Sequence, residues 1–161
     1  MERQYTRIDS VRAVLDAAIK NIPDEEKKRC AYIHLYGTGQ AAAFLTMKRG
    51  GDRQTAELAE IAGMLHDYAK YTEGSKVEHA ERSARSAETL LRELGEFSDA
   101  EIRMICNAIA AHSDKDVTGS PFDEVLKDAD EMQHYFRNPV EEHYFRKERV
   151  QRLLEEFHIR A

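Results

Sequence analysis

The chain has 161 residues, of which 42% are hydrophobic and 34% charged, and its formal net charge is −6. A domain of this length buries roughly 68–70% of its unfolded surface, so we expect one folded domain over residues 1–161 rather than a disordered chain. Its lysines and arginines alternate with acids instead of forming a basic run, which excludes nucleic acid from the partners we expect.

The distribution of apolar residues favours a cytoplasmic protein. The longest apolar stretches, such as residues 41–45 and 61–65, are far shorter than the roughly 20 residues needed to span a membrane. Residues 1–7 are polar, and no apolar signal-peptide segment follows them. Cys30 and Cys106 stand alone, which predicts reduced thiols and neither a disulfide framework nor a Cys-x-x-Cys metal site. We therefore expect no membrane among its partners.

Hydrophobic residues recur at three- and four-residue steps along the chain, a pattern that predicts amphipathic helices and no strand. The expected helices cover about residues 8–22, 24–49, 53–70, 77–94, 98–112, 121–132 and, after Pro139, about 140–157. Ser98 and Glu101 predict a capping box, and Pro121 suits a first helical turn. The polar segment over residues 71–76 could act as a lid. The prediction is an all-α bundle of about six to seven helices.

Two glycines, Gly37 and Gly39, fall inside the expected second helix close to His34. Glycine in a helix interior costs about 0.5–1 kcal/mol relative to alanine. This cost predicts that the glycines permit close backbone packing or access beside His34, and the alternative is a local break between two helices.

Histidines and aspartates on several predicted helices form a pattern suited to metal binding. The candidate ligands are His34, His66, Asp67, His79, His112 and Asp130. Imidazole and carboxylate groups suit Zn, Mn, Fe, Co or Ni, and helical proteins assemble such sites from facing helices. Adjacent helical residues point about 100° apart, so His66 and Asp67 can share a metal most easily at a helix end, where the backbone is free.

The segment AGMLHDYAK, residues 62–70, resembles the signature of the HD superfamily of metal-dependent phosphohydrolases. His34 upstream and Asp130 downstream stand where that family has its first histidine and last aspartate, so the resemblance covers about residues 29–132. It implies a single compact HD-domain helical bundle. The motif-bearing core would cover about residues 24–138, with the N- and C-terminal helices packed on it.

The histidines at positions 79 and 112 resemble the two additional ligands of the binuclear branch of the family. This resemblance implies two divalent transition metals per chain, of the set Fe, Mn, Co, Ni or Zn, with Asp67 as the bridging carboxylate. Two metals about 3.5–4 Å apart would lower the pKa of a bridging water toward neutrality and clamp a phosphoryl group.

Three basic residues are candidate substrate-binding groups. Lys70 lies one turn beyond His66, and the family pattern places it at the mouth of the site, as a catalytic residue together with Asp67. Arg82 follows His79 by three residues and Arg137 lies two turns after Asp130, so helical spacing alone suggests further phosphate contacts. The partner we expect is a small phosphorylated substrate, in particular a nucleotide.

The other histidines and the C-terminal aromatic residues are interpreted as structural. A lone histidine in a helix is more often a structural or surface residue than a ligand, so His134, His143 and His158 are excluded from the site. The aromatic residues over 135–136 and 144–145 are expected in the core or at an interface, which leaves room for a homodimer.

The leading hypothesis for the reaction is hydrolysis of a phosphate ester or anhydride by metal-activated water. The chain looks most like the bacterial symmetrical dinucleoside-tetraphosphate hydrolases, but after His112 the residues 113–116 (SDKD) replace the Thr-Thr-Gly expected for them. Two alternatives stay open: an HD-type diiron oxygenase with the same ligands, and a non-catalytic nucleotide-binding HD protein. The ligand set alone does not separate these three classes.

Overall fold

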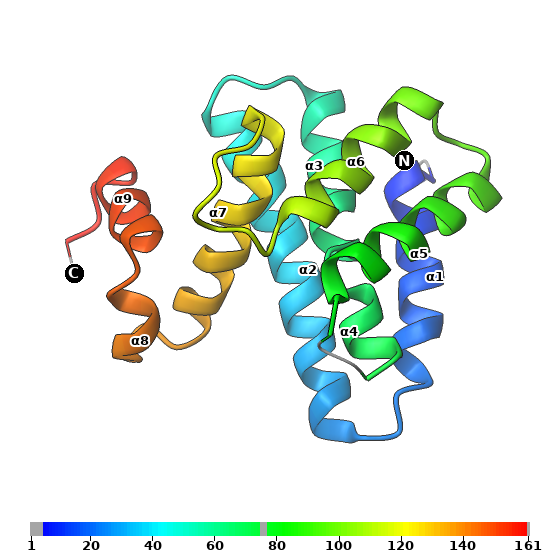
Figure 1. Ribbon diagram of the computed structural model, residues 1–161, viewed down its shortest axis with the longest axis horizontal. Helices are drawn as coiled ribbons and strands as arrows, with labels where there is room; N and C mark the ends of the chain where they lie inside the picture. The colour runs from blue at the N-terminus through cyan, green and yellow to red at the C-terminus, as the bar shows by residue number, and fades with distance from the viewer. Residues whose placement is uncertain (1–4, 75–76, 161) are drawn as a thin grey trace.

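The computed structural model describes residues 5–74 and 77–160, and its helices follow the predicted order (Figure 1). They are α1 (Arg7–Lys20), α2 (Glu25–Lys48), α3 (Arg53–Leu65), α4 (Tyr68–Thr72), α5 (His79–Leu94), α6 (Asp99–Ala111), α7 (Pro121–Arg137), α8 (Glu142–Phe145) and α9 (Glu148–Glu156). The described residues contain no strand, so the all-α prediction is confirmed. The first residues of the polar N-terminal segment, 1–4, and residues 75–76 of the expected lid lie outside the described residues.

The helix ends follow local signals in the sequence. Ser98 and Glu101 form the predicted capping box, in which the Ser98 Oγ accepts a hydrogen bond from the Glu101 N–H at 3.3 Å. Ser120 caps α7, and Pro121 occupies its first turn. Gly95 ends α5 with a φ of 68°, a left-handed conformation that glycine adopts without strain. Within the described residues, no helix is both long enough and apolar enough to cross a membrane.

The third predicted helix is interrupted in the structure. α3 ends at Leu65, His66 is its C-terminal cap, and Asp67 leaves the helical conformation with φ −110° and ψ 18° before α4 begins at Tyr68. The prediction of a continuous helix over residues 53–70 is therefore wrong. The sequence did not reveal the interruption, because its hydrophobic periodicity continues across it. The last predicted helix is likewise divided into α8 and α9, which gives nine helices in the described part of the chain.

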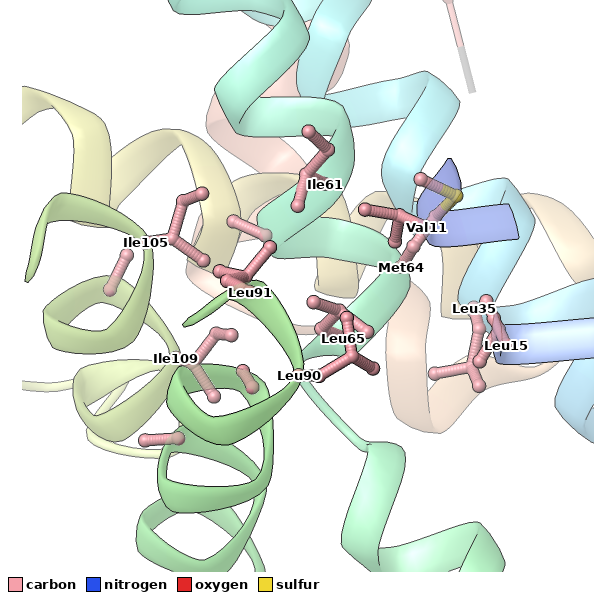
Figure 2. Close-up of a cluster of buried hydrophobic side chains, with 14 of the residues drawn as sticks. Val11, Leu15, Leu35, Ile61, Met64, Leu65, Leu90, Leu91, Ile105 and Ile109 are labelled. Atoms are coloured by element: carbon pink, nitrogen blue, oxygen red, sulfur yellow. The ribbon is translucent and has the colours of Figure 1, made fainter. Parts of the chain in front are cut away.

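The main hydrophobic core lies where α1, α2, α3, α5 and α6 meet, as Figure 2 shows. The buried side chains labelled there are Val11, Leu15, Leu35, Ile61, Met64, Leu65, Leu90, Leu91, Ile105 and Ile109. Full burial of a leucine or isoleucine side chain contributes about 1.5–3 kcal/mol. This core holds the C-terminal end of α3, which carries His66, against α2, which carries His34.

The C-terminal helices α8 and α9 pack beside α7, at the edge of the molecule opposite α1 and α5 (Figure 1). Tyr135 of α7 and Leu154 of α9 share a small buried cluster. The Asp128 carboxylate of α7 joins these elements by ion pairs, with Arg149 of α9 at 2.6 Å and with Arg49, the residue just after α2, at 2.7 Å. The segment is therefore attached to α7 by both apolar and charged contacts.

Helices α2 and α3 approach each other to backbone contact at two glycines. A Cβ added to Gly63 would lie 2.6 Å from both the Cα and the nitrogen of Gly39, closer than side-chain carbons ever come to backbone atoms. α2 continues without interruption through Gly37 and Gly39. The interpretation of close packing is therefore confirmed, and the alternative of a local break is wrong.

We expect the substitution Gly63→Ala to lower the free energy of unfolding by about 1–3 kcal/mol, because the new methyl group can be accommodated only by separating α2 from α3. Urea unfolding followed by circular dichroism measures this change. The control is Gln40→Ala on the exposed face of α2, which should stay within about 0.5 kcal/mol of the wild type. A Gly63→Ala variant as stable as the control would contradict the close approach.

Candidate metal centre

The six predicted ligands converge from different helices on one buried centre. His34 comes from α2, His66 and Asp67 from the junction of α3 and α4, His79 from the first residue of α5, His112 from the end of α6, and Asp130 from α7. They form overlapping groups in which the ligand atoms lie within 4.8 Å of one another. Five of the six are buried, and the His79 side chain is 25% exposed.

The first part of the centre contains two imidazoles and two carboxylates. The Oδ1 atom of Asp130 lies 3.4 Å from the Nε2 of His34 and 3.6 Å from the Nε2 of His66. The Oδ2 atom of Asp67 lies at the same distances, 3.4 and 3.6 Å, from these two nitrogens. Two donors that are each about 2.0–2.2 Å from one transition-metal ion lie roughly 3–3.5 Å apart.

The second part of the centre uses the other oxygen of Asp67. Its Oδ1 atom lies 3.4 Å from the Nε2 of His79 and 3.5 Å from the Nε2 of His112. Asp67 thus directs one oxygen toward each pair of imidazoles, an arrangement in which a carboxylate could bridge two ions through both of its oxygens. The break between α3 and α4 makes this position possible, because it turns Asp67 out of the helical course.

Two histidines are oriented by the helix ends on which they lie. The Nδ1 of His66 is 2.7 Å from the carbonyl oxygen of Gly63, and the Nδ1 of His112 is 2.7 Å from that of Ile109. The last carbonyls of a helix have no partner within it, so they can accept these N–H groups. The proton is thereby held on Nδ1, and the Nε2 lone pair faces the carboxylates, which is the tautomer that a metal-binding histidine needs.

His34 is oriented by a side chain instead. Its Nδ1 lies 2.5 Å from the Oε1 of Gln133 on α7, and the Gln133 amide nitrogen lies 3.5 Å from the carbonyl oxygen of Ile33. The amide can therefore accept from His34 with its oxygen and donate toward Ile33 with its nitrogen. Residue Gln133 was not among the predicted site residues, although it follows Asp130 by three positions on the same helix.

The carboxylates retain unsatisfied hydrogen-bonding capacity that a cation would use. Within the described residues, Asp67 Oδ1 and Asp130 Oδ1 are buried without a hydrogen-bond partner. Burying such an oxygen without compensation is costly, and buried charges are normally paired or coordinate metals. Together with the imidazole nitrogens of the centre, these oxygens form a donor set that suits a divalent transition metal.

Two lysines each neutralise one of the buried carboxylates. Lys70 contacts the Oδ2 of Asp67, and Lys115 lies 2.6 Å from the Oδ2 of Asp130. Lys115 belongs to the loop before α7 and was not predicted, because no spacing rule relates a loop residue to the site. Both lysine side chains are partly exposed, so the buried carboxylates are bordered by positively charged side chains that reach the surface.

The electrostatic environment keeps the carboxylates of Asp67 and Asp130 ionised and favours the neutral form of His66. Burial raises the pKa of Asp67, but its interactions with His66, His112, His34 and Lys70 outweigh burial, so this pKa lies well below its usual range. Burial also raises the pKa of Asp130. The charge of Lys115 and the neighbouring histidines His66 and His34 outweigh burial, so this pKa too lies well below its usual range. Burial lowers the pKa of His66. Anionic oxygens and neutral nitrogens are the forms that bind metal ions.

Arg82 and Arg137, the two arginines predicted to contact phosphate, have different surroundings from the two lysines. Arg82 forms an ion pair with Glu73 just after α4. Arg137 is exposed in the last turn of α7. Their roles in substrate binding stay predictions.

A further histidine lies at the centre. His134, which was excluded on sequence grounds, forms one of the groups of potential ligands together with His34 and Asp130. The signal that could have identified it is its spacing of four residues from Asp130, which places both side chains on the same face of α7. The other two excluded histidines, His143 and His158, are exposed.

Comparison with known proteins bears on this centre. A family model described as HD domain matches residues 31–135, a segment that contains all six predicted ligands. No curated protein and no solved structure matches the chain.

We expect the substitution Gln133→Met to weaken binding of a divalent metal by about 10–100-fold, the usual effect of removing the hydrogen-bond partner of a ligand. The change keeps the length of the side chain and removes the acceptor for His34. Calorimetric titration of metal-free protein with Mn²⁺ measures the affinity, and Gln40→Met on the exposed face of α2 is the control. Equal affinities in both variants would show that Gln133 does not orient His34 for metal binding.

Proposed function

The chain belongs to the HD domain family, a superfamily of metal-dependent phosphohydrolases, and we propose that it hydrolyses a phosphate ester or anhydride of a small metabolite, in particular a nucleotide. The observation that carries the proposal is the position of Asp67, whose two oxygens face two different pairs of imidazoles, His34 with His66 and His79 with His112. This arrangement favours a centre for two ions.

The residues that would hold one divalent ion are His34, His66, Asp67 and Asp130, and those for a second are Asp67, His79 and His112. Bound divalent metals supply Lewis acidity, which polarises a phosphoryl oxygen and lowers the pKa of a water toward neutrality. The protein holds their ligands in place before any substrate arrives, because the Nδ1 protons of His66 and His112 are committed to backbone carbonyls. Donors that need no reorganisation during the reaction stabilise developing charge most effectively.

Lys70 and Lys115 are the groups that would bind the anionic part of the substrate. Each ammonium group borders one carboxylate of the centre, and the two side chains are 27% and 23% exposed. With divalent ions bound to Asp67 and Asp130, the N–H groups of Lys70 and Lys115 would become available to phosphate oxygens. A phosphate would thus meet positive charge on two sides, whereas a neutral substrate would gain nothing from either lysine.

The preference for a nucleotide rests on the likeness of the 62–70 segment and the additional histidines to the dinucleoside-tetraphosphate hydrolases. Lys115 lies in the segment over 113–116 that differs from them. Because Lys115 brings an ammonium group to the centre from this loop, the substrate can differ from the one that the dinucleoside-tetraphosphate hydrolases cleave.

To test the reaction, phosphate release is measured without O₂ in the presence of Mn²⁺ or Co²⁺, with mononucleotides and dinucleoside polyphosphates as substrates. We expect turnover under these conditions, and Lys70→Gln or Lys115→Gln to lower kcat/KM by about 10–150-fold, since a hydrogen bond to a charged group contributes about 1.5–3 kcal/mol. The control is Lys20→Gln, which alters an exposed lysine at the end of α1.

Other outcomes of this assay point to other functions. Turnover that requires both iron and O₂ would identify an oxygenase. Tight, metal-dependent nucleotide binding without turnover would identify a non-catalytic binding protein. Either result would overturn the proposed hydrolysis.

The number of metals is a separate prediction. Elemental analysis of protein purified without added metal should give about two divalent ions per chain, and about one in His79→Ala and in His112→Ala, because each variant removes a ligand of the second ion. The variant His143→Ala, which alters an exposed histidine on α8, should keep both ions. One ion per chain in the wild type and in all variants would contradict the binuclear centre.

A further inference from the structure

Three imidazole nitrogens, not two, surround the buried Oδ1 atom of Asp130. The Nε2 of His134 lies 3.4 Å from it, the same distance as the Nε2 of His34, and the Nε2 of His66 lies at 3.6 Å. This oxygen has no hydrogen-bond partner among the described residues. The three nitrogens thus converge on an anionic oxygen without satisfying it.

An ordinary hydrogen bond between His134 and Asp130 does not account for this arrangement. The N–H···O bonds of proteins are 2.7–3.2 Å long in general, about 0.2 Å or more below the observed 3.4 Å. The other ring nitrogen, Nδ1, is buried and has no partner in the described part of the chain. Two atoms that ligate the same ion, in contrast, lie roughly 3–3.5 Å apart.

The ring of His134 is held in this position by packing. It stacks on the ring of Tyr144 from α8, with an interplanar angle of 3° and centroids 4.9 Å apart. Tyr144 is in turn covered by the ammonium group of Lys147, which lies 2.8 Å from a carboxylate oxygen of Glu131 on α7. Hence α8 fixes the plane of an imidazole that no hydrogen bond to a protein carbonyl orients.

His134 would share an ion with His34 and His66, because a separate third ion beside His134 would lack His34 as a ligand. An imidazole nitrogen has one lone pair, so each nitrogen of His34 serves one ion at most. The Nδ1 of His34 is committed to Gln133, which leaves its Nε2 alone for the cluster that it shares with His134 and Asp130.

We propose that His134 is a fifth ligand of the ion held by His34, His66, Asp67 and Asp130. The two halves of the centre then differ in the number of candidate donors. Five residues, in two groups that share His34, lie in the half nearest α7, whereas three, Asp67, His79 and His112, form the other half. The ion nearest α7 is bound more tightly and has few positions left for other ligands. The half formed by Asp67, His79 and His112 would leave more coordination positions free, so an ion held there could bind the substrate phosphate.

This inference rests on the metal centre of the proposed function but not on the reaction. Both of its tests are therefore made without substrate, so a failure to release phosphate would leave their outcome unaffected.

The first test is calorimetric titration of metal-free protein with Co²⁺. His134→Gln should weaken the tighter of the two binding phases. Loss of the hydrogen-bond partner of a ligand weakens metal binding by roughly 10–100-fold, and loss of a ligand itself should cost at least as much. The looser phase should remain as in the wild type. The matched control is His143→Gln, which changes the exposed neighbour of Tyr144 and leaves both phases unchanged. Unchanged affinity in His134→Gln would overturn the proposal.

The second test uses the unmodified protein and does not depend on the folding of a variant. Protein labelled with ¹⁵N-histidine is loaded with ¹¹³Cd²⁺, and a one-bond coupling between the metal and the Nε2 of a histidine identifies that residue as a ligand. We expect this coupling for His134 as for His34, and none for His143. Coupling at His34 without coupling at His134 would overturn the assignment even if the affinity of His134→Gln were reduced.

Discussion

The backbone contact between α2 and α3 is the constraint on which the centre depends. Gly39 and Gly63 leave no space for a Cβ between the two helices. At this separation the Nε2 atoms of His34 and His66 lie 3.1 Å apart. Gly63 also supplies the carbonyl that holds the Nδ1 of His66. One residue therefore sets both the distance between the helices and the orientation of a ligand at the end of one of them.

The second constraint is charge. Asp67 and Asp130 are ionised although they are buried, and isolated buried carboxylates would be costly. Lys70 and Lys115 each neutralise one of them, and the buried imidazole of His66 remains neutral. The centre is thus stable as a set of ion pairs and also presents unpartnered oxygens. A cation can bind there without first displacing every partner of the carboxylates.

The C-terminal helices contact residues that adjoin the candidate metal centre. Arg149 of α9 pairs with Asp128 on α7 and donates a hydrogen bond of 2.9 Å to the carbonyl oxygen of Lys115. The same side chain thus ties α9 to α7 and holds the loop that carries a lysine of the centre. Tyr144 of α8 stacks on His134. The aromatic C-terminal segment was expected in the core or at an interface. Through Tyr144 it instead packs against a residue that adjoins the centre.

The sequence by itself determined the helical class, the order of the helices and the six candidate ligands. Periodicity and capping residues act over a few positions and can be read without the fold, and the 62–70 segment carries a motif in contiguous residues. The tertiary structure alone decided where the third predicted helix is interrupted, because Asp67 leaves the helix in response to partners on three other helices. It also decided that Lys115, Gln133 and His134 adjoin the centre. Their contacts join residues that lie far apart in the chain or in a loop without periodicity, and only the packing of α7 against α2 and α3 brings them together.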